Sequence, residues 1–157
     1  MNNSDEYYMK QALKEAKKAY QNGDVPVGAI IVINGKIVSR GYNQKEKKKN
    51  ALLHAEVIAI NKALKKLDIK ILDNATIYTT LEPCLMCMGA IINSRIKRIV
   101  VGTLDQRFGM ITNKVNLFDL NLNHYPKIDV LNNIDCSNIL SNFFKDLREK
   151  KSLEKEI

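Results

Sequence analysis

Histidine and cysteine, the side chains that most often bind transition metals, are scarce in this chain, and three of the five fall in two short motifs. The 157 residues contain two histidines and three cysteines. His54 opens the motif His54-Ala55-Glu56, and two of the cysteines form the motif Cys84-x-x-Cys87. One imidazole nitrogen and two sulfurs suit zinc and leave a fourth tetrahedral position for water, as in catalytic rather than structural zinc sites.

Glu56 supplies a carboxylate for proton transfer, which a catalytic zinc site needs in addition to its metal ligands. Zinc lowers the pKa of a bound water towards about 7, and a nearby carboxylate can take that proton and pass it to a ring nitrogen and then to a leaving amine. Two alternatives stay open: Glu56 could merely stabilise a helix N-terminus, and the two cysteines could be core thiols or a redox pair. The third cysteine, Cys136, is expected to pack as a small apolar residue.

The elements that must position these residues follow from hydrophobic spacing and turn residues. The predicted elements are a helix over 5–21, strands over 27–33 and 36–40 joined by Asn34-Gly35, a helix from about residue 53, a strand over 75–81, a helix over 84–92, strands over 96–101 and 127–131, and a closing helix that frays into the charged tail. Residues 103–126 are predicted to form a long loop. This order predicts an α/β fold with a mixed sheet of about five strands, and it places His54, Cys84 and Cys87 at the starts of two successive helices that point towards the same edge of the sheet.

Length and charge limit the classes of protein to consider. The length fits one domain over residues 1–157, with a charged tail from about residue 150. No apolar run is long enough to cross a membrane and the first residues do not form a secretion signal, so we expect a cytoplasmic protein with reduced cysteines. Lys and Arg number 25 against 17 Asp and Glu, and residues 36–70 alone carry an excess of seven positive charges. Such a segment suits a nucleic-acid partner, although a solvated lysine-rich face is the simpler alternative.

The two motifs together resemble the H-x-E and P-C-x-x-C signature of the zinc nucleobase deaminases. The chain is similar, more narrowly, to the bacterial tRNA-specific adenosine deaminases, through Asp24-Val25-Pro26-Val27-Gly28-Ala29, Gly41-Tyr42-Asn43, the segment 80–90 and Ser94-Arg95-Ile96. That family converts adenosine to inosine at the wobble position (34) of tRNA anticodons. The resemblance implies a three-layer α/β/α cytidine-deaminase-like fold, one zinc ion per chain held by His54, Cys84 and Cys87, Glu56 as the proton shuttle, a tRNA anticodon stem-loop as substrate, and a homodimer.

The resemblance also implies a set of substrate-binding residues. These are Val27 against the base, Asn43 at the flipped nucleoside, Asp105, Arg107, Asn123 near the RNA, and Phe144 and Arg148 on the closing helix. His124, which follows Asn123, is placed outside the metal site. Arg107 stands where the family usually has lysine, and Met110-Ile111-Thr112 stands where it has small residues. Helical spacing alone is equally compatible with Phe144 as a core residue.

Two other functions fit parts of the pattern. A deaminase of a free base or nucleotide, such as guanine or deoxycytidylate, shares the same metal signature. A non-catalytic, zinc-stabilised RNA-binding module would keep the metal ligands but has no need of a carboxylate at Glu56. The basic segment and the Asn43 and Ser94-Arg95-Ile96 matches favour RNA as the substrate.

Overall fold

The computed structural model describes residues 3–111 and 119–156. In this part of the chain, five strands form one sheet in the order β2-β1-β3-β4-β5. The elements in chain order are α1 (Asn3–Gln21), β1 (Gly28–Ile33), β2 (Lys36–Tyr42), α2 (Ala55–Leu67), β3 (Thr76–Leu81), α3 (Leu85–Asn93), β4 (Arg98–Thr103), β5 (Lys127–Val130) and α4 (Ile134–Lys155). The prediction of an α/β fold with a mixed five-stranded sheet is confirmed.

The strand directions place the starts of α2 and α3 at one edge of the sheet. β1 runs antiparallel to both β2 and β3, whereas β3, β4 and β5 are parallel. The β1–β2 turn has φ 50° at Asn34 and φ 74° at Gly35, the left-handed pair that a type I′ turn requires. The carboxyl ends of β2, β3 and β4 are connected to α2, α3 and the loop from residue 104. We call the edge at the carboxyl ends of β3 and β4 the carboxyl edge, and the edge where β4 and β5 begin the amino edge.

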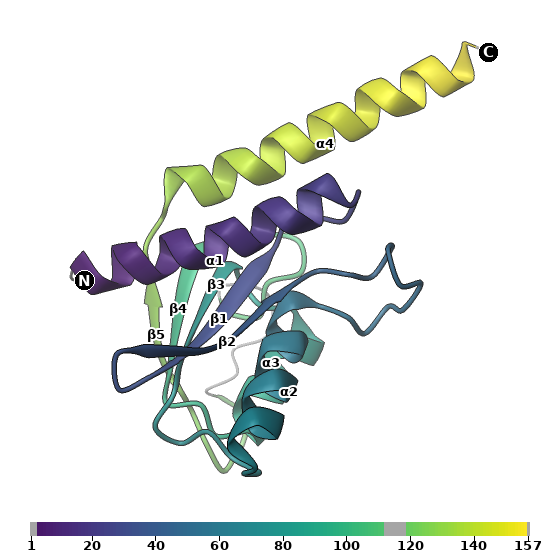
Figure 1. Ribbon diagram of the computed structural model, residues 1–157. Coiled ribbons are helices and arrows are strands. Elements are labelled where there is room, and N and C mark those ends of the chain that lie inside the picture. The colour runs from purple at the N-terminus through teal and green to yellow at the C-terminus, as the bar shows by residue number, and fades with distance from the viewer. Residues whose placement is uncertain (1–2, 112–118, 157) are drawn as a thin grey trace.

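Helices cover both faces of the sheet, so the fold has three layers (Figure 1). α1 and α4 lie over one face, and α2 and α3 lie over the other. Side chains that alternate along β1 enter different cores: Ile30 packs with Met9 and Val100 under α1, whereas Ile31 packs with Ile91 under α2 and α3. Burial on both faces explains why β1 is an almost uninterrupted apolar run.

Gly41 allows α2 to begin very close to the sheet. A Cβ atom at Gly41 would lie 2.4 Å from the carbonyl oxygen of Ala55 and 2.8 Å from the backbone nitrogen of Ala59. Only a glycine therefore permits this approach of helix to strand. The close approach fixes the first turn of α2, and His54 with it, against the carboxyl edge.

Both terminal helices are long, reaching Asn3 at one end of the chain and Lys155 at the other. α1 already includes Asn3, whereas the predicted helix begins at residue 5. α4 continues to Lys155, past the position near 150 where we expect the tail to begin. No glycine or proline follows Pro126, and Lys, Leu, Arg and Glu favour helix, so nothing in the sequence ends α4 earlier.

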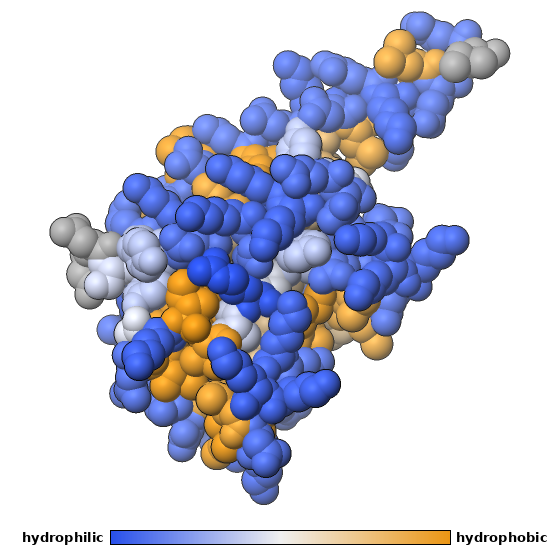
Figure 2. Space-filling model, viewed as in Figure 1, coloured by the Kyte–Doolittle hydropathy of each residue, from blue (hydrophilic) through white to orange (hydrophobic). Residues whose placement is uncertain are grey.

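Polar residues dominate the side of the molecule shown in Figure 2, and they cover most of the C-terminal half of α4. Within residues 3–111 and 119–156, no helix combines the length and the apolar composition needed to span a membrane.

Candidate active site

A cluster of metal-ligating side chains lies at the carboxyl edge, where two helices begin. His54 is the N-cap of α2 and Cys84 the N-cap of α3, both with extended backbone, and neither side chain caps its helix. The Nδ1 atom of His54 lies 3.6 Å from the Sγ of Cys84 and 3.5 Å from the Sγ of Cys87. The predicted convergence of these three residues is confirmed. No other group of three potential ligands occurs among the residues that the structure describes.

The donor atoms fit a zinc ion. Tetrahedral zinc with bonds of about 2.3 Å to sulfur and about 2.0 Å to nitrogen places these atoms about 3.5 Å from each other. The observed nitrogen–sulfur distances of 3.5 and 3.6 Å are therefore those of a shared tetrahedral metal. Cys136 stays outside this cluster, because it is fully buried on the first turn of α4, where its Sγ would lie 2.5 Å from a Cβ at Gly102 in β4.

Glu56 lies beside the cluster and is shielded from solvent. Its side chain is on the first turn of α2, it is only 4% exposed, and its carboxyl group interacts with the thiol of Cys87. Burial raises the pKa of Glu56 to about 7. A hydrogen bond with Cys87, helped by His54, lowers the pKa of Cys84 to about 4. The thiolate of Cys84 in turn raises the pKa of His54. This pattern concentrates negative charge where a cation would be held.

Asn43 connects the segment before β1 to the start of α2. Its Oδ1 accepts a hydrogen bond from the backbone N–H of Ala55 at 2.8 Å, and its Nδ2 donates to the carbonyl of Val25 at 3.0 Å. Its backbone N–H donates to the carbonyl of Val27, which is itself 5% exposed. These bonds place both predicted substrate residues, Val27 and Asn43, at the carboxyl edge beside the first turn of α2.

The loop after β4 lies against the segment that carries Cys84. The backbone N–H of Met110 donates to the carbonyl of Pro83 at 3.0 Å. Within this loop, the carboxylate of Asp105 accepts from the backbone N–H groups of Arg107 and Phe108. The guanidinium of Arg107 lies 5.3 Å from the centre of the Phe108 ring, and both side chains are exposed. Asp105 thus folds the loop, and Arg107 is presented to solvent at the carboxyl edge.

Phe144 and Arg148 reach the same edge from α4. They share a hollow of about 340 Å³ with Leu104, the residue that directly follows β4. Phe144 is 41% exposed, whereas its neighbour Phe143 is 8% exposed and packs against Tyr20. The core position on this turn therefore belongs to Phe143, and the ring of Phe144 faces outwards.

Asn123 lies elsewhere. Its carbonyl accepts a hydrogen bond from the guanidinium of Arg95 at 3.0 Å, at the amino edge, where α3 ends and β5 is about to begin. The structure does not bring Asn123 to the metal cluster within this chain, and its proximity to RNA stays a prediction. His124 donates from Nε2 to the carbonyl of Ile96 at 2.7 Å and lies outside the metal cluster, as expected.

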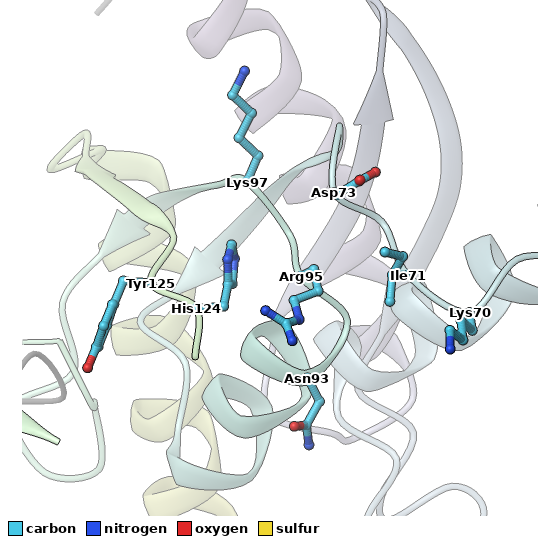
Figure 3. Close-up of a pocket in the computed structure, with 8 residues that line it drawn as sticks. All are labelled: Lys70, Ile71, Asp73, Asn93, Arg95, Lys97, His124 and Tyr125. Atoms are coloured by element: carbon cyan, nitrogen blue, oxygen red, sulfur yellow. The ribbon is translucent and has the colours of Figure 1, made fainter. Parts of the chain in front are cut away.

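The hollow around Arg95 is larger than the hollow beside Phe144, but it is not the metal site. Its volume is about 740 Å³, and its lining residues are Lys70, Ile71, Asp73, Asn93, Arg95, Lys97, His124 and Tyr125 (Figure 3). In Figure 3 the side chain of Lys97 extends away from Arg95. Cations at the ends of α2 and α3 are favoured by the helix dipoles, and Arg95 already binds Asn123, so a structural role accounts for this charge.

Two carboxylates at the carboxyl edge have roles that sequence reasoning missed. Asp24 is 1% exposed and accepts from the backbone N–H groups of Glu46 and Lys47, at 2.7 and 3.2 Å. Glu82 is 3% exposed and accepts from the backbone N–H groups of two residues in the loop after β4. An acidic residue next to a buried apolar strand is the sequence signal that could have found them.

Comparisons with known proteins agree with this site. Residues 2–103 match the family model of the cytidine and deoxycytidylate deaminase zinc-binding region. A tRNA-specific adenosine deaminase of Bacillus subtilis (strain 168) is 44% identical over 150 residues, which cover 94% of this chain and 92% of that protein.

Two solved structures are similar in fold. One comes from a study of A-to-I editing by tRNA:A34 deaminases at the wobble position of transfer RNA; it has a TM-score of 0.83 and 33% identity, and the match covers 86% of this chain and 99% of the other. The second is a guanine deaminase from Bacillus subtilis, with a TM-score of 0.61 and 38% identity over 66% of each chain. The guanine deaminase therefore matches a smaller part of the chain.

Proposed function

The chain belongs to the cytidine and deoxycytidylate deaminase zinc-binding family, and from this premise we propose that it deaminates adenosine to inosine at the wobble position (34) of a tRNA anticodon. The reaction is hydrolytic: water adds at C6 of the adenine ring, and the amino group leaves as ammonia. The observation that carries the proposal is the His54, Cys84 and Cys87 cluster beside a buried carboxylate, within a chain that matches tRNA-specific adenosine deaminases over 94% of its length.

We assign His54, Cys84 and Cys87 as the zinc ligands. Their one nitrogen and two sulfurs leave a fourth tetrahedral position for water, which is the ligand count of a catalytic site. Zinc bound there supplies a water molecule that is readily deprotonated near neutral pH. The first turns of α2 and α3 hold the three side chains in place, because each helix is packed against the sheet.

Glu56 moves the protons. Its carboxylate lies on the first turn of α2 beside Cys87 and is shielded from bulk water, so it can take a proton only from groups inside the site. In the proposed sequence Glu56 accepts a proton from the attacking water and delivers it to the ring nitrogen N1. It then takes the remaining proton of the hydroxyl group added at C6 and passes it to the amino group, which leaves as ammonia. A carboxylate that only stabilised a helix would not need this position next to a thiol of the cluster.

Three segments around the cluster suit an RNA loop better than a free base. The lysine-rich residues 45–49 follow Asn43, the loop after β4 presents Arg107, and α4 presents Phe144 and Arg148. Cations can bind phosphates and an exposed aromatic ring can stack on an unpaired base. A guanine or deoxycytidylate deaminase has no use for such an extended basic and aromatic surface.

The decisive experiment compares substrates. The zinc-loaded protein is incubated with anticodon stem-loops that bear adenosine or guanosine at the wobble position, and with free adenosine, guanine and deoxycytidylate. We expect inosine from the adenosine stem-loop alone. Deamination of guanine or deoxycytidylate without inosine in the stem-loop would establish the alternative enzyme, and RNA binding without any turnover would establish the non-catalytic module.

Glu56→Gln sharpens the same experiment. This variant keeps the side-chain shape but cannot accept a proton, so single-turnover inosine formation should fall at least about 10²- to 10⁴-fold. Zinc content and stem-loop affinity should stay at wild-type values. An active Glu56→Gln enzyme would remove the proton-shuttle role.

We also propose that the chain forms a homodimer through the outer side of α3, in the cytoplasm. The outward residues of this helix are apolar or small: Leu85 is 67% exposed, Met86 and Ala90 are half-buried, and a Cβ at Gly89 would meet nothing within 4 Å. A side with these residues is suited to close packing against another helix. A stable dimer would have twice the 17.9 kDa mass of the chain.

Gly89→Glu tests this interface without disturbing the monomer, since the side chain enters open space and glutamate favours helix more than glycine does. We expect light scattering to show a dimer for the wild type and a monomer for Gly89→Glu. Leu153→Glu, which adds the same charge at an exposed position of α4, serves as the matched control and should remain dimeric. A monomeric wild type, or a dimeric Gly89→Glu, would argue against this interface.

A further inference from the structure

Glu82 links the segment that carries Cys84 to the loop after β4. It directly precedes Pro83 and Cys84, and its side chain is 3% exposed. Its Oε1 accepts the backbone N–H of Asp105 at 2.9 Å, and its Oε2 accepts the backbone N–H of Ile111 at 2.7 Å. One carboxylate therefore holds both ends of the segment 105–111.

The loop is shaped to enclose this carboxylate. A Cβ at Gly109 would lie 2.2 Å from the Cδ of Glu82 and 2.4 Å from its Oε2, so only glycine leaves room for the carboxylate. Gly109 also donates its backbone N–H to the carbonyl of Asp105. The buried carboxylate and the glycine are complementary in shape, and neither belongs to the cluster of His54, Cys84 and Cys87.

The segment 105–111 carries exposed side chains at the carboxyl edge. Residues 105–111 turn Arg107 and Phe108 outwards, and Phe108 is 64% exposed. The same segment is bonded through Met110 to the carbonyl of Pro83, one residue before Cys84. An exposed aromatic ring next to a guanidinium is suited to stacking on a base beside a phosphate.

We propose that Glu82 is a positioning residue for RNA: through its two backbone hydrogen bonds it holds residues 105–111 against the Cys84 segment, so that Arg107 and Phe108 meet the RNA next to the metal cluster. The inference rests on the proposed function for its substrate. Glu82 itself touches neither the RNA nor the metal. Its effect is to order the loop before RNA binds, which reduces the entropy lost on association.

Glu82→Gln is the primary test. Glutamine keeps the size of the side chain but replaces one acceptor oxygen with an NH₂ group, which faces a backbone N–H that it cannot bond. Hydrogen bonds to charged groups are strong enough that the loss should weaken stem-loop binding about tenfold or more, seen as a higher KM. We expect kcat and the zinc content to stay close to those of the wild type, because the cluster and Glu56 are unchanged.

Gly109→Ala disrupts the same contact between Glu82 and the loop by a change in the loop. Its methyl group must displace the carboxylate or the loop, so we expect the same rise in KM with unchanged zinc. Asp129→Asn is the matched control, since it exchanges carboxylate for amide at the amino edge, where Asp129 binds Arg98. The control should leave KM unchanged.

Amide hydrogen exchange measures the hydrogen bonds between Glu82 and the loop in the absence of any substrate. The amides of Asp105 and Ile111 should be protected in the wild type and exchange faster in Glu82→Gln. Asp24→Asn makes the same chemical change at another buried carboxylate of the carboxyl edge. It should release the amides of Glu46 and Lys47 but not those of Asp105 and Ile111.

The outcomes separate this inference from the proposed function. If the wild type does not deaminate the stem-loop, the proposed function fails, while exchange at Asp105 and Ile111 and stem-loop affinity still report on Glu82. Loss of zinc in Glu82→Gln would show that Glu82 supports the metal segment instead, and would overturn the inference. Unchanged KM and unchanged exchange in both Glu82→Gln and Gly109→Ala would overturn it as well.

Discussion

The two histidines of this chain lie at opposite edges of the sheet, and their neighbours give them different roles. His54 at the carboxyl edge has two thiols within 3.6 Å of its Nδ1. His124 at the amino edge is bonded to a backbone carbonyl and lines a hollow with lysine and arginine around it. The carboxyl edge thus gathers metal ligands and a buried carboxylate. The amino edge gathers cations at helix ends, where they stabilise the fold.

The amino edge also contains a partly buried ion-pair network. Arg98 at the start of β4 donates to both oxygens of Asp5 at 2.9 and 2.8 Å, and to Asp129 at 2.8 Å. Tyr78 donates to Asp5 as well, at 2.7 Å. These bonds connect α1 to β3, β4 and β5. The larger hollow therefore lies at the edge that contains this ion-pair network, and not at the His54, Cys84 and Cys87 cluster.

The largest difference is expected between the two histidines themselves. His54→Ala should lose the zinc ion, of which the wild type holds about one per chain. Removing a hydrogen-bond partner of a metal ligand lowers activity by roughly 10- to 100-fold, and removing the ligand itself should lower turnover by more than that. His124→Ala should keep both zinc and turnover. Metal analysis and single-turnover inosine formation on the two variants measure this. Equal zinc loss in both would mean that His124 also serves the metal.

Arg98→Met should separate stability from activity. Methionine keeps the apolar packing of the side chain but leaves Asp5, which is 1% exposed, without its ion pair. Breaking a buried pair costs about 3–5 kcal/mol, and because Arg98 is partly exposed we expect the free energy of unfolding to fall by about 2 kcal/mol. Turnover measured well below the melting temperature should stay near the wild-type rate.

Urea unfolding of Arg98→Met and Glu56→Gln, run side by side, checks this separation. Tyr78→Phe, which removes one hydroxyl from the same network, should reduce the free energy of unfolding by only about 1 kcal/mol. A fall in turnover with unchanged stability in Arg98→Met would contradict the assignment of the amino edge to structure.

Salt dependence compares the cations of the two edges. If Lys47 and Lys48 in the basic loop bind phosphates, changing both to alanine should lower stem-loop affinity and reduce the log–log salt slope by roughly 0.7 for each phosphate that is no longer neutralised. Changing Lys70 and Lys97 to alanine at the amino edge should leave the slope at its wild-type value. Titrations at several salt concentrations measure both pairs. An equal reduction of the slope in the two pairs would place RNA at both edges.

The smallest effect concerns the cysteine outside the cluster. Burial raises the pKa of Cys136 to about 12, so its reactive thiolate is scarce at pH 8 and becomes common only as the pH rises towards 12. With the metal chelated, a thiol reagent at pH 8 should label Cys84, whose pKa is lowered, but leave Cys136 unmodified until denaturant is added. Mass spectrometry of the labelled chain counts the modified cysteines. Early labelling of Cys136 would show that the start of α4 opens easily.

Local patterns in the sequence predicted most of the fold. The Asn34-Gly35 turn, the apolar spacing of α2 and the short motifs that begin α2 and α3 act over a few residues, because turn geometry and helix periodicity are local properties. The convergence of His54, Cys84 and Cys87 followed from the same information, since chain order and strand direction place successive helix starts at one edge. The sequence pattern left the end of the closing helix open: α4 continues past 150 into the charged tail, because no residue there disfavours helix.

What the sequence by itself determined is thus the set of elements, the mixed sheet and the residues able to hold zinc. Only the tertiary structure decided which polar groups pair across the chain: Glu82 bonds to Ile111 and Asp24 to Glu46, over separations of 29 and 22 residues. Such bonds leave no periodic signal, because each depends on where two loops come together in space. The same is true of Phe143 and Phe144, since the packing of α4 against α1 decides which ring is buried, and of Asn123, which the course of the chain takes to the amino edge.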